Sequence, residues 1–149
     1  MYGKTGRAVQ ISSSDQVVLS ADVRGATTFL LVACRAWNTV TEALRPRCIS
    51  LMDANRADWY VRHDGTDITV ESETDTENLP LFQLESSFVL HVDTFYPGYY
   101  ALEALSLPNQ YVTALSDGRL GIVQQESTAD YCDTASFRVY DYDTSSMYS

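Results

Sequence analysis

The sequence is poor in histidine, cysteine and positive charge, and each shortage excludes a class of function. Only 2 histidines and 3 cysteines occur in 149 residues, with no CxxC, HExxH or His/Cys cluster, so a zinc site is not expected. The 10 Lys and Arg residues face 20 Asp and Glu residues, which gives a formal net charge of −10. Nucleic acid and anionic membranes both require a basic surface, so neither is an expected partner.

Catalytic signatures and long apolar runs are missing too. The sequence has no Gly-X-Ser-X-Gly motif, no P-loop and no motif that fixes two carboxylates across a cleft, so we expect neither an enzyme nor a cofactor. The longest apolar stretch, Phe29–Cys34, is far shorter than the roughly 20 residues that span a membrane. Residues 1–20 lack the apolar segment of a secretory signal, so the chain is either cytosolic or a mature or excised piece of a longer precursor.

The three cysteines leave two interpretations open. Cys34 and Cys48 would close a loop of about 14 residues, and their oxidation would contribute about 3 kcal/mol. Cys132 would then be unpaired. Three reduced, buried thiols fit the sequence equally well, because disulfides persist only outside reducing compartments.

What the sequence does have is internal repetition. The segment Leu51–His63 aligns without a gap on Leu102–Ala114, so that two tyrosines and two valines coincide. Two further patterns each occur three times, one beginning at a glycine and one centred on a phenylalanine: Gly6, Gly65 and Gly118; Phe29, Phe88 and Phe137. The chain therefore reads as one domain, 1–149, with three units of roughly 50 residues at about 1–47, 48–98 and 99–149. We expect the three phenylalanines to be buried in a shared core.

Each unit reads as short strands joined by turns. In the second unit the apolar and alternating segments predict four strands, and the acidic stretch 71–78 is a solvated loop: Ile49–Ala54, Trp59–His63, Ile68–Val70 and Phe88–Val92. The third unit repeats this order, with 124–134 as its polar loop. Tyr100–Leu105 has helix propensity, but its register in the repeat predicts a strand.

The first unit is expected to lack its first strand. We match Tyr2 to Tyr60 and Tyr111, which leaves nothing before it. Unpaired neighbouring strands would expose backbone donors and acceptors, so another segment should fill the gap. The tail Asp141–Ser149 can do so in cis, or a second chain can do so in trans, which predicts an oligomer. The low apolar content of the tail favours the trans arrangement.

The aligned segments resemble the arabinose-binding domain of α-L-arabinofuranosidase B, a family 42 carbohydrate-binding module. That repeat reads approximately Ser-Phe-Glu-Ser-Val-Asn-Tyr-Pro-Gly-X-Tyr-Leu-Arg-His, followed by a hairpin and Asp-Ala-Thr-Phe. Leu51–His63 matches it in register, with Asn55 on the family Asn, and the third unit adds Glu103 and Pro108. The resemblance implies an all-β fold, a β-trefoil, over nearly the whole chain.

The resemblance also implies a sugar pocket built from a histidine and a carboxylate. Only the second unit keeps the histidine, as His63, and Glu85 stands at the aspartate position; the other units have Ala26, Ala114 and Thr134 at such places. Tyr60 and Trp59 can add aromatic surface, since a sugar presents hydroxyls to polar groups and C–H bonds to a ring. His63 as an exposed hairpin residue, Glu85 as a surface charge and Tyr60 as a core residue are the alternatives.

Two functions follow from the resemblance. The first is a non-catalytic carbohydrate-binding module, with a pentofuranose-type glycan as partner, in an extracellular or cell-surface protein. The second is a structural or protein-interaction subunit with degenerate sugar pockets. The aromatic segment Phe95–Tyr100 fits either function, because it can stack on a sugar, contact a protein or fold back onto its own domain.

Overall fold

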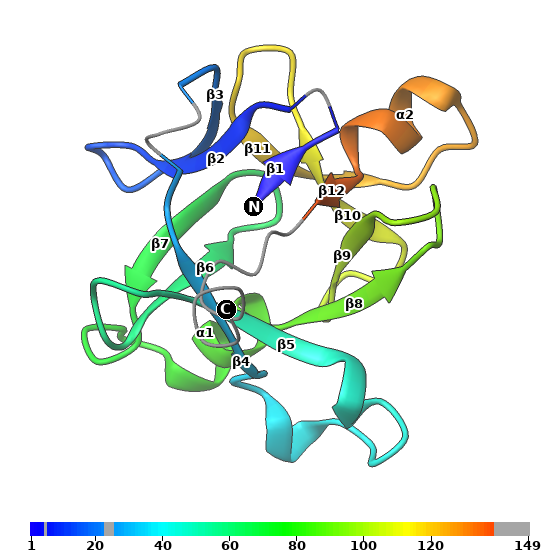
Figure 1. Cartoon of the computed structure of the whole chain (residues 1–149). Helices are drawn as coiled ribbons and strands as arrows, with labels where there is room; N and C mark the ends of the chain where they lie inside the picture. Colours follow the sequence, from blue (N-terminus) through cyan, green and yellow to red (C-terminus); the bar gives the residue numbers. More distant parts are fainter. Residues whose placement is uncertain (5, 23–25, 139–149) are drawn as a thin grey trace, which may run out of the picture.

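The computed structural model describes residues 1–4, 6–22 and 26–138 (Figure 1). Twelve strands, two short α-helices and two 3-10 helices make up this part of the chain. The strands are β1 (Tyr2–Gly3), β2 (Ala8–Ile11), β3 (Val17–Ser20), β4 (Phe29–Ala33), β5 (Cys48–Asp53), β6 (Trp59–His63), β7 (Ile68–Ser72), β8 (Phe88–Val92), β9 (Tyr100–Ala104), β10 (Gln110–Ala114), β11 (Leu120–Gln124) and β12 (Phe137–Arg138). The helices are η2 (Trp37–Thr39), η3 (Arg45–Arg47), α1 (Leu79–Glu85) and α2 (Ala129–Thr134). The predicted all-β class is confirmed.

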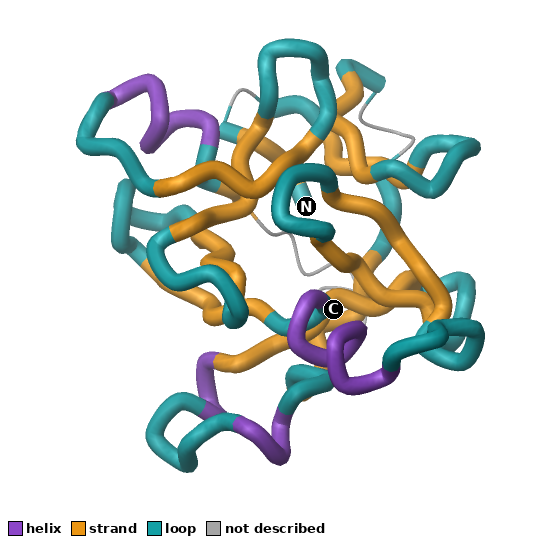
Figure 2. Tube along the Cα trace, turned by 180° about the vertical axis from the view of Figure 1, so that it is seen from behind, coloured by secondary structure: helices purple, strands orange, loops and turns teal. Residues whose placement is uncertain are grey.

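The strands form one antiparallel sheet that bends around a common interior (Figure 1). Its main path runs β3-β2-β1-β12-β9-β8-β5-β6-β7, with β10 and β11 attached to β9 and with β4 attached to β5. Seen from behind, the helices lie at the outside of the molecule, between strands (Figure 2). Hairpins β2–β3, β6–β7 and β10–β11 meet through three isolated bridges: Gln16 with Thr69, Val18 with Arg119, and Asp67 with Gly121.

The same cross-strand pairs recur three times along the chain. A residue in the first two positions of each hairpin-forming strand faces an equivalent residue on the preceding strand: Ala8 faces Tyr2, Tyr60 faces Met52, and Tyr111 faces Glu103. Each predicted core phenylalanine also faces a residue of this preceding strand: Phe137 faces Gly3, Phe29 faces Asp53, and Phe88 faces Ala104.

The expectation that the first unit lacks its first strand is wrong. Strand β1 occupies that place, and it pairs with β2 on one side and β12 on the other. Tyr2 corresponds by its pairing to Met52, so it does not correspond to Tyr60. The mismatch arises because the first unit has two turns, one at Gly6 before β2 and one at Asp15 after it, and the glycine-led pattern was matched to the wrong one. The tail Asp141–Ser149 lies outside the described residues.

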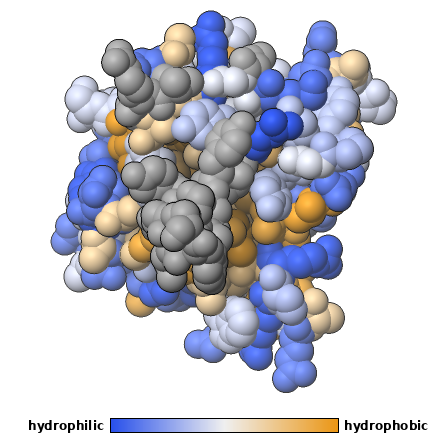
Figure 3. All heavy atoms as spheres, in the orientation of Figure 1, coloured by the Kyte–Doolittle hydropathy of each residue, from blue (hydrophilic) through white to orange (hydrophobic). Residues whose placement is uncertain are grey.

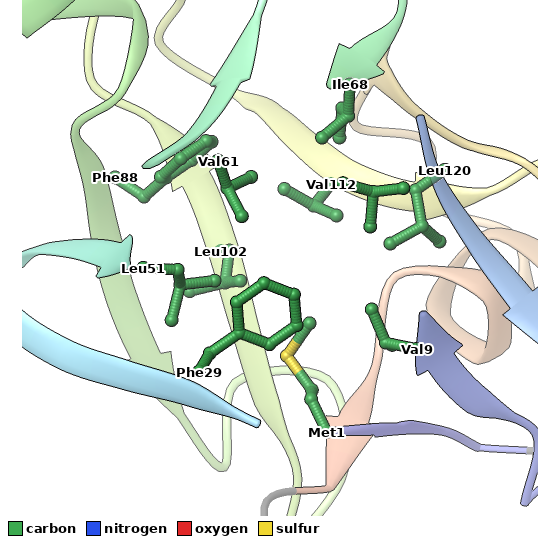
Figure 4. A pocket seen from close by; sticks show the side chains of 11 residues that line it. Met1, Val9, Phe29, Leu51, Val61, Ile68, Phe88, Leu102, Val112 and Leu120 are labelled. Atoms are coloured by element: carbon green, nitrogen blue, oxygen red, sulfur yellow. The ribbon is translucent and has the colours of Figure 1, made fainter. Parts of the chain in front are cut away.

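The core consists of apolar side chains that converge from all three units (Figure 4). They enclose a residual cavity of only about 10 Å³, so the interior is closely packed. Phe88 and Phe137 are completely buried, as predicted. Phe29 points into the same interior but remains partly exposed.

Two local expectations concern segments 100–105 and 124–134. Strand β9 replaces the helix that local propensity favours at Tyr100–Leu105, which confirms the prediction from the repeat. The polar loop at 124–134 contains helix α2, which was not predicted. Its Thr128 side chain accepts a hydrogen bond from the Tyr131 backbone N–H, and Asn78 caps α1 in the same way through Leu81. Helices of 6 and 7 residues give too few turns for a periodic signal.

Cys34 and Cys48 form a disulfide with a Cα–Cα distance of 5.2 Å. This confirms the oxidised interpretation of the sequence. Both cysteines are buried, and the bridge ties the end of β4 to the start of β5 across the segment that carries η2 and η3. Cys132 is a free thiol.

Candidate functional site

Three of the four predicted site residues lie on strand β6, on its two opposite faces, and the fourth, Glu85, ends helix α1. Trp59 and His63 lie on the side that faces the core, together with Val61. Tyr60 lies on the opposite side, where its ring meets Phe82 of helix α1 at a centroid distance of 6.3 Å. Alternation along a strand imposes this division, so the four side chains do not converge on one point.

His63 is buried, and both of its ring nitrogens have partners. The backbone N–H of Gly65 donates to Nδ1 at 3.0 Å, which makes Nδ1 an acceptor. Nε2 therefore carries the proton and donates to the Ser106 hydroxyl at 3.1 Å. The ring also packs edge-on against Phe88, and burial lowers the pKa of His63 below its usual 6.5. His63 is thus a neutral, interior residue in this structure.

Glu85 is held by an arginine. The Arg62 Nε and Nη2 atoms donate to its Oε1 at 2.9 Å and 2.6 Å. Helix α1 ends at Glu85 and so places this carboxylate beside the outward-facing Arg62 of β6. Both side chains are only 16% exposed. In the unliganded fold Glu85 is therefore paired with Arg62 and makes no hydrogen bond to His63.

The two aromatic residues of the predicted site are also covered by arginines. The Arg35 guanidinium lies 4.8 Å from the Tyr60 ring centre and is fixed by two hydrogen bonds to Glu73, at 2.8 Å and 2.6 Å. Tyr60 is buried, and this burial raises the pKa of its hydroxyl. Arg56 lies 4.1 Å from the Trp59 ring. Sequence reasoning missed these arginines, although Arg62 lies within the quoted motif.

The aromatic segment between β8 and β9 folds back onto the domain only in part. Phe95 packs edge-on against Tyr111 and Tyr131, with centroid distances of 5.1 Å and 6.0 Å. Tyr96 and Tyr99 remain partly exposed, and Lys4 Nζ lies 4.6 Å from the Tyr96 ring centre. Phe95 is therefore a packing residue, whereas the two tyrosines contribute to the surface.

An open polar groove lies elsewhere, among the β2–β3 turn, the start of β4 and the β5–β6 turn. Its volume is about 470 Å³, within the 300–1,000 Å³ typical of small-molecule sites. Hydroxyl, carboxylate, amide and guanidinium groups line it: Ser12, Ser13, Asp15, Thr27, Thr28, Asp53, Asn55 and Arg56, with Ile11 and Ala26. Two residues of this groove match positions of the family motif in sequence: Asn55 matches its asparagine, and Ala26 stands at its aspartate position.

Residues 1–4, 6–22 and 26–138 contain no group of three or more His, Cys, Asp or Glu side chains suited to hold a metal ion. The same ranges contain no helix that is long and apolar enough to span a membrane.

The chain is a small all-β domain. Its three hairpins meet one another, and its strands surround one shared core. Residues 2–139 match the family described as the alpha-L-arabinofuranosidase B (ABFB) domain. The chain belongs to this family. Among curated proteins, no sequence matches the chain.

Solved structures share the fold at low sequence identity. A mutant of a GH54 α-L-arabinofuranosidase soaked with 4-nitrophenyl α-L-arabinofuranoside superposes on 89% of this chain with a TM-score of 0.61 and 14% identity. An arabinofuranosidase complexed with arabinofuranosyl-α-1,2-xylobiose gives 0.61 and 17% over the same share. The chain spans only 30% of the length of either enzyme chain. Interleukin-36alpha also matches, with a TM-score of 0.57 and 18% identity over 88% of this chain and 84% of its own.

Proposed function

We propose that this chain is a non-catalytic carbohydrate-binding module for a pentofuranose-type glycan, within an extracellular or cell-surface protein. The observation that carries the proposal is the family match over residues 2–139. The disulfide supports an oxidising location, since such bonds are rare in the cytosol.

We further propose that the fold is a β-trefoil, as the resemblance implies. Three cross-strand phenylalanine pairs and three hairpins in mutual contact support it, because both recur once per unit.

In the second unit, the predicted site residues take two different roles. Glu85 keeps part of its side chain at the surface and faces the ligand, with Arg62 beside the carboxylate, whereas Trp59 lies on the other face of β6. His63 and Tyr60 are buried on opposite faces of β6 and fix the position of this strand. The arginine pairing fixes the orientation of Glu85, so its free oxygen is directed before a sugar arrives.

A glycan array, followed by calorimetry with arabinan fragments, tests the function directly. We expect weak, saturable binding of a pentofuranosyl glycan by the intact, oxidised domain. A Glu85→Gln variant keeps the size of the side chain and removes its charge. A loss of glycan affinity in this variant therefore reports on the carboxylate and not on a cavity left by a smaller side chain. A flat titration against every arabinan fragment and an empty array would contradict the proposal.

A protein-interaction role is the second candidate, and strand β4 favours it. Leu30 and Leu31 are 39% and 51% exposed, although they lie in the middle of a strand. Within the described residues, β4 pairs with β5 alone. An unpaired edge with apolar side chains is a template for strand addition. Sedimentation of the domain and of a Leu31→Ser variant over a range of concentrations distinguishes the roles, because only an interaction module self-associates through Leu31.

Most of the visible surface is hydrophilic, with hydrophobic residues in smaller areas between polar ones (Figure 3). The exposed large hydrophobic residues among those described are few: Leu30, Leu31, Trp37, Leu79, Leu81 and Val92. A mainly polar surface fits a module whose ligand is a neutral, hydroxyl-rich glycan better than one that binds a broad apolar partner.

A further inference from the structure

The connection between β4 and β5 protrudes from one end of the molecule and carries helices η2 and η3 (cyan in Figure 1). It spans residues 34–47, whereas the corresponding connection between β8 and β9 spans only 93–99. The bond between Cys34 and Cys48 closes its base. We call residues 34–48 the disulfide loop.

Backbone hydrogen bonds and one buried side chain fix the disulfide loop. Trp37 N–H donates to the Cys34 carbonyl at 3.0 Å, and Thr39 N–H donates to the Ala36 carbonyl at 2.9 Å. Ala36 is buried, and its own N–H donates to the Ser87 hydroxyl at 3.0 Å, which anchors η2 to the body of the domain. A loop that is fixed in advance loses little conformational entropy when a ligand binds to it.

Two arginines of the disulfide loop have no carboxylate partner. Most other basic side chains form ion pairs with Asp or Glu: Lys4, Arg35, Arg56, Arg62 and Arg119. Arg45 and Arg47 form none within the described part of the chain, and Arg7 resembles them in this. The chain has twice as many acidic as basic residues, so these two guanidinium groups are left to pair with an external anion.

Trp37 lies beside one of these arginines. It is 39% exposed, and the Arg45 guanidinium lies over its ring, 5.2 Å from the ring centre. Arg45 Nε donates to the Trp37 carbonyl at 3.3 Å, which leaves the two Nη groups without a hydrogen bond to any described residue. The loop therefore presents aromatic surface next to charged donors. This combination suits a ring that carries a carboxylate.

The exposed neighbours of Trp37 in the loop are polar. They are Asn38, Thr39 and Thr41, which offer one amide and two hydroxyls. Such groups both donate and accept, as the hydroxyls of a sugar do. A protein partner would need an apolar centre to its interface, and a single half-exposed indole among polar groups does not provide one. The loop thus favours a sugar over an acidic protein as the anionic ligand.

We propose that the disulfide loop binds an acidic sugar, a hexuronic acid residue of an anionic polysaccharide. Arg45 and Arg47 bind its carboxylate, and the exposed part of the Trp37 ring packs against its C–H groups. Asn38 and Thr39 form hydrogen bonds with its hydroxyls.

The local charge of the loop permits this ligand. Three arginines and one acidic residue, Glu42, lie between Cys34 and Cys48, although the whole chain has a net charge of −10. Salt at physiological strength screens carboxylates more distant than about 8 Å. The inference rests on the proposed carbohydrate-binding function, but it concerns a charged ligand and a surface that contains neither His63 nor Glu85.

Nitrogen-15 NMR titration of the intact, oxidised domain with oligogalacturonate tests the site. The chain has two tryptophans, so their indole N–H signals report on two separate places. We expect the Trp37 indole signal and the Asn38 backbone signal to shift and saturate. The Trp59 indole signal, from β6, should stay in place. The methyl ester of the same oligosaccharide keeps the rings and removes the charge, and it should bind at least tenfold more weakly.

Three variants remove the proposed contacts one at a time. Trp37→Ala, Arg45→Gln and Arg47→Gln should each weaken the affinity for oligogalacturonate about tenfold. Arg7→Gln is the matched control, because Arg7 is also exposed and without a carboxylate partner among the described residues, but it lies between β1 and β2. It should leave the affinity unchanged. Melting temperatures confirm that every variant is folded.

The results decide this proposal separately from the pentofuranose function. Oligogalacturonate binding that moves the Trp37 signal and is weakened only in the loop variants supports the site. Unchanged affinity in those variants overturns it, and so does equal affinity for the methyl ester or for a short polyglutamate peptide. Binding of arabino-oligosaccharides without any binding of oligogalacturonate overturns the acidic-sugar site alone. Binding of oligogalacturonate without any arabinan fragment overturns the pentofuranose ligand alone, and a domain that binds no glycan overturns both.

Discussion

His63 donates a hydrogen bond from Nε2 to the Ser106 hydroxyl, 3.1 Å away, and so joins strand β6 to the turn between β9 and β10. The contact crosses from the second unit to the third. It satisfies one ring nitrogen of a histidine that resembles a sugar ligand in sequence but is 1% exposed in the fold. The same bond fixes the tautomer, because Gly65 donates to the other ring nitrogen.

The first prediction concerns acid. Burial lowers the folded-state pKa of His63 below 6.5, so the unfolded chain binds this proton more readily than the folded one. The contribution of His63 to the free energy of unfolding should therefore be fully present above about pH 6.5. It should decrease as the pH falls from there toward the lowered pKa. Urea denaturation between pH 5 and 7.5 measures it. A His63→Gln variant should lose this part of the pH dependence.

His91→Gln is the control for that experiment, because it removes the other histidine, which pairs with Glu103 at 2.8 Å. Glu85 and Asp64 favour protonation of His63, and Arg62 opposes it, but both effects are smaller than that of burial. Equal unfolding free energies for the wild type at pH 5 and pH 7.5 would show that His63 is not buried as a neutral ring.

The sequence predicted the all-β class but not the strand register at the start of the chain. Phe88 and Phe137 could be placed in the core because their neighbours recur at the same spacing. Tyr2 was misplaced because only its distance to a glycine was available, and two turns compete for that match. The arrangement of the predicted site residues could not be read from the sequence for another reason: side-chain direction on β6 and the partners of the arginines depend on the tertiary structure. Nothing local to Arg62 indicates that it, and not His63, meets Glu85.

The second prediction compares core phenylalanines. Phe88→Ala and Phe137→Ala should each cost about 3–5 kcal/mol, since both rings are fully buried in a closely packed interior. Phe29→Ala should cost less, about 1–2 kcal/mol, because that ring is partly exposed. Chemical denaturation at one pH ranks the three variants. If Phe29→Ala were the most damaging, Phe29 would have to be as buried as the others.

The third prediction concerns the disulfide. A Cys34→Ala/Cys48→Ala double variant should lose about 3 kcal/mol, because it releases a loop with a sequence separation of 14 in the unfolded chain. Cys132→Ala is the control and should leave the unfolding midpoint nearly unchanged. A thiol assay of the denatured, unreduced wild type should count one free thiol. Three free thiols under oxidising conditions would contradict the bridge.

The last prediction concerns Gly121, at the contact between hairpins β6–β7 and β10–β11. A Cβ atom there would lie 2.9 Å from the Thr66 carbonyl oxygen and 2.8 Å from a Leu115 methyl. The Leu115 side chain can turn away, but the carbonyl is backbone and already accepts a hydrogen bond from Ile122 N–H at 2.9 Å. The substitution must therefore push β11 away from the neighbouring turn and weaken that bond.

Gly121→Ala should accordingly destabilise the fold by about 1–3 kcal/mol, the usual cost of overpacking a closed contact. Gly3→Ala is the matched control, because its nearest neighbour would be a Leu19 methyl at an ordinary 3.4 Å and its φ is not positive. Thermal melts of both variants decide the matter. If Gly121→Ala melts with the wild type while Gly3→Ala does not, the contact between the two hairpins is looser than the Asp67–Gly121 bridge implies, and the convergence of the three hairpins no longer supports the trefoil arrangement.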